Sequence, residues 1–132
     1  MLHHLTLWVP DLAQAEESWN WLLGELGYTR DVSVDRVVLL RHPSGVAVVL
    51  EQSPDMVPGM LYSRMRPGLN HLAFRVEPAS ALATITEQAG DYGWSALPGD
   101  RHPIAGGAQV TYLEDRDGFE VELVASAVPT PV

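Results

Sequence analysis

The sequence repeats one order of structural signals twice, and this duplication limits the possible folds more than any other feature. Residues 2–52 and residues 69–125 each begin with a short apolar strand that carries histidine near its start. In both halves a helix follows, then a glycine–aromatic pair, and finally a turn and an apolar strand. Such repetition indicates two copies of one supersecondary unit. We therefore predict two βαβββ modules within one domain, residues 1–132.

Helical periodicity and capping residues predict one helix in each half. Asp11 can cap the first helix, with Gln14 three residues further on, as in a capping box. Apolar side chains then recur at helical spacing, and Gly27 suits a left-handed C-terminal cap. We expect the second helix to begin near Pro78, a residue tolerated in a first turn, and to end near Gly90.

The residues between the two halves predict a linker, residues 53–68. This segment contains three prolines and two glycines, which interrupt regular structure. It also contains four large apolar side chains, which are unusual in a free tether: Met56, Met60, Leu61 and Met65. We expect this segment to lie against the protein or against a partner subunit.

Charge and composition exclude several classes of function. The chain has 8 basic and 17 acidic residues, for a formal net charge of −9, so its surface should repel phosphate backbones and anionic lipid. No apolar run approaches the roughly 18 residues of a membrane span, and no signal peptide is evident. The chain has no cysteine, which excludes disulfides, thiolate metal ligands and cysteine nucleophiles. We expect a cytoplasmic protein with neither nucleic acid nor membrane as a partner.

Strand alternation places histidines and carboxylates on the face of each sheet that points away from its helix. Successive side chains of a strand point to opposite faces, and the apolar set of each strand should pack on the helix. The other set is His4, Thr6 and Trp8 in the first strand, His71 and Arg75 in the fifth, and Glu120 and Glu122 in the last. We predict an α+β fold in which two mixed sheets form an open, cup-like pseudo-barrel with the helices outside and these side chains inside.

His4, His71 and Glu122 are a chemically sensible set of metal ligands. Neutral imidazole suits zinc, copper, iron and nickel, and a carboxylate suits harder ions. A set of two histidines and one carboxylate leaves coordination positions open for water or substrate, which is typical of a catalytic metal rather than a structural one.

Glu51 is a candidate fourth ligand. Glu122 lies four residues after Gly118, and the residue four positions after Gly45 is Val49. Strict pseudo-symmetry therefore gives no fourth ligand, because Glu51 lies two residues further, roughly 6–7 Å along the strand. A different turn or a bulge could still bring Glu51 to the metal.

The chain resembles the vicinal oxygen chelate superfamily, which includes glyoxalase I, extradiol dioxygenases, fosfomycin-resistance enzymes and bleomycin-binding proteins. The resemblance covers nearly the whole chain and is most specific in Leu2-His3-His4-Leu5, in Trp8-Val9-Pro10-Asp11-Leu12, in Gly68-Leu69-Asn70-His71-Leu72-Ala73-Phe74, and in residues 114–123. It implies that His4, His71 and Glu122 hold one divalent metal ion (Ni, Zn, Fe, Mn or Co). Such an ion chelates neighbouring oxygens of a small-molecule substrate and stabilises developing negative charge as a Lewis acid.

The resemblance favours a lyase or isomerase of the glyoxalase type, and other branches stay open. Glyoxalase I has four ligands, which implies Glu51 as the fourth ligand and as a group that moves a proton. Trp8 stands where glutathione-using members tend to carry arginine. Extradiol dioxygenases use three ligands and a tyrosine ten residues before the glutamate, a spacing that Tyr112 matches. His102 lies one residue out of register with the further histidine of those dioxygenases.

The remaining alternative is a protein that sequesters a small molecule, such as an antibiotic, without catalysis. Bleomycin-binding members usually lack the metal histidines, so His4 and His71 argue against this alternative. Fosfomycin-resistance enzymes need many basic groups for a phosphonate, and the acidic balance here disfavours them.

Several further residues are assigned to the cup around the metal. His102 lies in a loop that could cover the site or supply an acid or base, and Tyr112 is either catalytic or a packing aromatic. We expect Thr6, Trp8 and Arg75 to line the cup, where Trp8 could stack on a flat substrate. The resemblance also implies a homodimer, because chains of two modules usually pair in this family.

Overall fold

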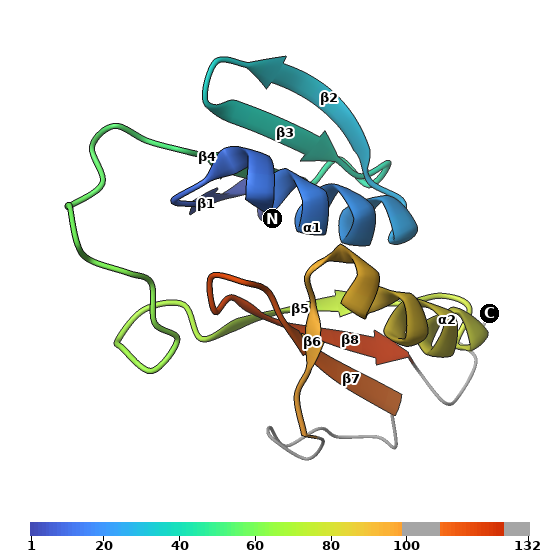
Figure 1. The fold of residues 1–132 in the computed structure, drawn as a ribbon. Coiled ribbons are helices and arrows are strands. Elements are labelled where there is room, and N and C mark those ends of the chain that lie inside the picture. Colours follow the sequence, from blue (N-terminus) through green and yellow to red (C-terminus); the bar gives the residue numbers. More distant parts are fainter. Residues whose placement is uncertain (99–108, 126–132) are drawn as a thin grey trace. The chain divides into compact units, whose positions relative to one another are not determined.

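The fold consists of two four-stranded mixed sheets, each with a helix along one face (Figure 1). The structure is a computed structural model that describes residues 1–98 and 109–125. The chain divides into two compact units, Met1–Leu61 and Tyr62–Val132. Neither sheet closes into a barrel, so the predicted α+β class with two open mixed sheets is confirmed. The joint cup that the two sheets would form stays a prediction.

The first unit contains four strands and one helix. In chain order these are β1 (His4–Trp8), α1 (Leu12–Glu25), β2 (Thr29–Val34), β3 (Val37–Arg41) and β4 (Ala47–Glu51). The strand order in the sheet is β1-β4-β3-β2, with β1 parallel to β4 and the other neighbours antiparallel.

The second unit repeats this arrangement strand for strand. Its elements are β5 (His71–Arg75), α2 (Ser80–Gln88), the 3₁₀ helix η1 (Ala89–Tyr92), β6 (Ser95–Ala96), β7 (Gln109–Glu114) and β8 (Glu120–Ala125). The strand order is β5-β8-β7-β6, with β5 parallel to β8. The predicted duplication of a βαβββ module is therefore confirmed by topology.

The first helix begins and ends where the sequence predicts. The Asp11 carboxylate accepts a hydrogen bond of 3.1 Å from the backbone N–H of Gln14, which satisfies one of the free N–H groups of the first turn. Gly27, with φ of 92°, follows the helix in the left-handed conformation that favours glycine. The apolar stripe is buried against the sheet and includes Ala15, Trp19, Leu22 and Leu23.

The second helix is shorter than predicted at both ends. It begins at Ser80 rather than near Pro78, and it passes into η1 after Gln88, with Gly93 in the left-handed conformation (φ 86°) closing the 3₁₀ turn. Leu82 and Ile85 are the buried residues of α2. No helix within residues 1–98 and 109–125 has the length and apolar character needed to cross a bilayer.

The second compact unit begins inside the predicted linker. The ring of Tyr62 stacks on Phe119 with centroids 4.1 Å apart, and its hydroxyl donates to the carbonyl oxygen of Leu69. The segment from Tyr62 to Asn70 thus belongs to the second unit. Met60, Leu61 and Met65 of the predicted linker are 62%, 74% and 75% exposed within the chain, so their expected contact with a partner subunit stays a prediction.

The N-terminal cap of α1 gives the first prediction. Asp11→Ala removes the acceptor for the Gln14 N–H and should lower the free energy of unfolding by about 1 kcal/mol in urea titrations. Asp55→Ala, a change at an exposed acidic residue outside the helices, should stay within about 0.5 kcal/mol of the wild type. Equal losses in the two variants would contradict a capping role.

Candidate functional site

The register of the second sheet places His71 and Glu122 on one face. Residues opposite one another in neighbouring strands project to the same side of a sheet. One row across β5, β8 and β7 contains His71, Glu120 and Glu114, and a second row contains Ala73, Glu122 and Tyr112. The opposite face carries Thr111, whose hydroxyl is 3.2 Å from that of Thr86 on α2. His71 and Glu122 therefore project away from the helix, as strand alternation predicts.

Glu122 lies between Ala73 and Tyr112 on this face. Glu122 is 8% exposed, and Tyr112 opposite it on β7 is 1% exposed. Its partner on β5 is Ala73, two residues beyond His71, or roughly 7 Å along the strand. No hydrogen bond or ion pair reaches Glu122 from the residues that the structure describes. A carboxylate with little solvent exposure is stabilised by a neighbouring cation.

His71 is held through its Nδ1 atom. This nitrogen lies 2.7 Å from Oδ1 of Asn70 and 3.8 Å from Oε2 of Glu120. An acceptor at Nδ1 leaves the lone pair of Nε2 available, which is the usual arrangement for a histidine that ligates a metal.

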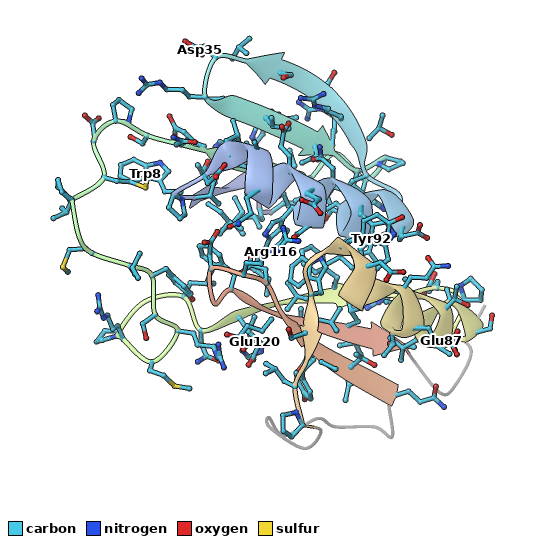
Figure 2. The ribbon with its side chains drawn as sticks, in the orientation of Figure 1. Trp8, Asp35, Glu87, Tyr92, Arg116 and Glu120 are labelled. Carbon is cyan, nitrogen blue, oxygen red and sulfur yellow. The ribbon has the colours of Figure 1, made fainter. Side chains whose placement is uncertain are left out.

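The positive charge of Arg64 compensates the carboxylate of Glu120, which lies on the same face as Glu122. Glu120 is the first residue of β8 (Figure 2). Its side chain is fully buried, and its Oε1 lies 3.4 Å from Nε of Arg64. Nη1 of Arg64 lies 3.3 Å from Oε1 of Glu114 and donates to the carbonyl oxygen of Gly118 at 3.2 Å. The Arg64 guanidinium thus forms ion pairs with two carboxylates and a hydrogen bond with the turn at Gly118.

The hydroxyl of Tyr62, which lies near Arg64 and Glu120, has a raised pKa. Burial raises the pKa of Tyr62, the nearby carboxylates of Asp115 and Glu120 raise it further, and Arg64 opposes the rise. Tyr62 therefore stays a hydrogen-bond donor over the ordinary pH range and keeps its bond to Leu69.

In the first unit, His4, Thr6 and Trp8 lie on one exposed face of β1. Nδ1 of His4 lies 2.8 Å from Nδ1 of His3, so one of these rings donates to the other. Trp8, which is 46% exposed, donates from Nε1 to Oε1 of Glu51 at 2.9 Å. This hydrogen bond therefore fixes the indole of Trp8 and the carboxylate of Glu51 relative to each other.

The register of β1 and β4 decides how Glu51 relates to His4. His4 is opposite Ala47, Thr6 is opposite Val49, and Trp8 is opposite Glu51. Because Thr6 and Val49 correspond to Ala73 and Glu122 of the second unit, Val49 is the counterpart of Glu122, as pseudo-symmetry predicts. Glu51 is offset from His4 by four residues, roughly 13 Å along the strand, which is too far for both to share an ion within this sheet.

The other candidate residues are spread over both units. Arg75 is exposed at the end of β5, on the face of His71 and opposite Val124. His102 lies outside the described residues. Of the three predicted ligands, His4 belongs to the first unit, and His71 and Glu122 belong to the second. Within residues 1–98 and 109–125, no three His, Asp or Glu side chains are grouped closely enough to hold a metal ion.

Sequence reasoning did not identify Arg64 or Asn70 as parts of the site. It placed Glu120 on the same face as Glu122 by strand parity but gave it no role. Asn70 is adjacent to His71, but adjacency alone does not predict a hydrogen bond. Arg64 lies in the predicted linker, and no local pattern connects it with β8.

Residues 3–112 match the family model of the glyoxalase/bleomycin resistance protein/dioxygenase superfamily. The chain belongs to this superfamily. The resemblance to vicinal oxygen chelate proteins is thereby confirmed, and the duplicated module with its open sheets is the glyoxalase fold.

Similar proteins cover nearly the full length of the chain. The uncharacterized protein YqjT of Bacillus subtilis (strain 168) is 36% identical over 127 residues, which are 94% of this chain and 98% of that protein. The structure of a candidate glyoxalase from Bacillus halodurans is 35% identical, with a TM-score of 0.83 over 95% of each chain. The fosfomycin-resistance protein FosX from Listeria monocytogenes, solved with Mn(II) and sulfate, is 20% identical with a TM-score of 0.68, covering 97% of this chain and 91% of FosX. That last likeness shows the fold alone.

Proposed function

We propose that this chain is a divalent-metal-dependent enzyme of the glyoxalase/dioxygenase type that acts on a small molecule with two adjacent oxygens. His4, His71 and Glu122 would hold the metal ion. The observation that carries the proposal is the position of Glu122, which is 8% exposed, on the same sheet face as a His71 ring that is held through Nδ1. Within the superfamily, FosX was solved with Mn(II).

The donor set fits a divalent ion of the first transition row. Two imidazoles and one carboxylate suit Mn, Fe, Co, Ni or Zn and leave positions open. When bound, the ion would polarise two neighbouring oxygens of a substrate as a Lewis acid. The remaining side chains of these faces, Thr6, Trp8 and Arg75, would orient the substrate, since they are exposed in their units.

A three-ligand set is favoured over the four-ligand set of glyoxalase I. Val49 stands at the position that corresponds to Glu122, and Glu51 accepts the indole N–H of Trp8. Glu51 is therefore left out of the proposed ligand set, and with it the proton shuttle that the glyoxalase resemblance implies. His102 and Tyr112 remain the candidates for proton transfer in lyase or isomerase chemistry.

Metal content is the experiment that tests this proposal. Purified protein should bind close to one divalent ion per chain, measured by plasma mass spectrometry after equilibration with Mn(II), Ni(II) or Zn(II). His4→Ala, His71→Ala and Glu122→Gln should each weaken binding by tenfold or more, because each removes one of three ligands. His42→Ala provides the matched control, since that imidazole binds Ser44 in a turn and should not affect metal content. Metal-free wild-type protein would refute the proposal and favour sequestration.

Ring cleavage is a second candidate function because Tyr112 lies directly opposite Glu122 on the same face. A phenol there would donate a proton to, or accept one from, a substrate hydroxyl. Wild-type protein reconstituted with Fe(II) should then consume oxygen in the presence of catechol. Tyr112→Phe should lower that rate by about 100-fold with unchanged iron content. Absence of oxygen uptake by the iron-loaded wild type would exclude ring cleavage and favour lyase or isomerase chemistry.

The proposal includes a homodimer. Met60, Leu61 and Met65 are exposed in one stretch of chain, and an apolar stretch of this kind indicates an interaction site. Light scattering should give twice the mass of the chain, 14.5 kDa. Replacement of Met60 and Met65 by Ser should weaken the dimer, whereas a monomeric wild type would contradict this part of the proposal.

A further inference from the structure

We infer that the loop from Tyr62 to Asn70 is a positioning device that fixes the tautomer of His71, with the proton on Nδ1 and the lone pair on Nε2. Asn70 acts directly on the ring, and Arg64 acts through both Asn70 and Glu120. The consequence for metal binding rests on the proposed function, whereas the tautomer itself does not.

The orientation of the Asn70 amide follows from its two partners. Nδ2 of Asn70 lies 3.1 Å from the backbone carbonyl oxygen of Arg64, which can only accept a hydrogen bond. The NH₂ group must therefore face Arg64, and Oδ1 must face His71 at 2.7 Å. Since Oδ1 can only accept, Nδ1 of His71 must carry the proton.

Glu120 adds a negative charge on the same side of the ring. Its Oε2 lies 3.8 Å from Nδ1 of His71, and its Oε1 lies 3.4 Å from the Arg64 guanidinium. The carboxylate is fully buried and is held on its far side by the cation, so its negative potential favours a proton on Nδ1. The side chain and the backbone carbonyl of Arg64 thus both favour one tautomer of His71.

His42 provides a contrast within the same chain. Nδ1 of His42 lies 3.1 Å from the backbone nitrogen of Ser44, which can only donate, and 2.8 Å from the Ser44 hydroxyl, which can donate or accept. Both contacts are satisfied when Nδ1 carries the lone pair and Nε2 carries the proton. The structure therefore assigns opposite tautomers to His42 and His71. Both can be read from one NMR spectrum, and His42 serves as an internal reference.

Long-range ¹H–¹⁵N correlation spectra of the neutral imidazoles test the inference without any metal. In the wild type, His71 should show the Nδ1–H pattern and His42 the Nε2–H pattern. Asn70→Ala should shift His71 towards the Nε2–H form and leave His42 unchanged. Asn70→Asp, which keeps an acceptor for Nδ1, should retain the wild-type pattern. Asn70 is exposed, so these variants should fold, and circular dichroism checks that they do.

Cobalt titration of the same variants tests the consequence for metal binding. Asn70→Ala should weaken Co(II) binding by about 10–100-fold, and Asn70→Asp should stay close to the wild type. An Nε2–H pattern for His71 in the wild type, or a pattern unchanged in Asn70→Ala, would overturn the positioning role. A shifted tautomer with unchanged Co(II) affinity would overturn its link to the metal. Failure of the wild type to bind Co(II) would instead overturn the proposed function, while the spectra still decide the tautomer.

Discussion

In each half of the chain the first strand pairs in parallel with the last, and every candidate position depends on the register of that pairing. β1 pairs with β4 and β5 pairs with β8, so residues far apart in sequence become neighbours on one face. A parallel pair needs a long crossover, which here contains the helix and two further strands. A slip of one residue in β8 would turn Glu120 and Glu122 towards α2. The apolar residues that face the helices therefore fix the positions of the polar residues that face away from them.

The buried charge of Glu120 explains why the loop that begins at Tyr62 belongs to the second unit. A buried carboxylate requires a compensating cation, and Arg64 supplies one while also joining Glu114 and the Gly118 carbonyl. Removal of Arg64 would leave two carboxylates close together on one sheet face. The loop that connects the two units is thus tied to the strand that carries the proposed ligand Glu122.

The two halves have the same topology but differ in the chemistry of corresponding positions. Glu122 in the second half corresponds to Val49 in the first, and the nearest carboxylate of the first half, Glu51, is bonded to Trp8. Each half would thus supply a histidine, while only the second supplies a carboxylate. This asymmetry is the physical basis for the proposal of three ligands rather than four.

The sequence by itself determined the duplication, the cap of α1 and the strand parity of His4, His71 and Glu122, because periodicity and capping depend on near neighbours along the chain. It also identified Val49 as the counterpart of Glu122, although a bulge could still have brought Glu51 into that place. Only the tertiary structure decided that Glu51 binds Trp8 and that Arg64 and Asn70 act on Glu120 and His71. The Trp8–Glu51 contact crosses a parallel strand pair, and the Arg64–Glu120 contact joins a loop to β8. These two depend on register and burial, which no local pattern of residues encodes, whereas Asn70 and His71 are neighbours whose side-chain contact depends on the fold of the loop.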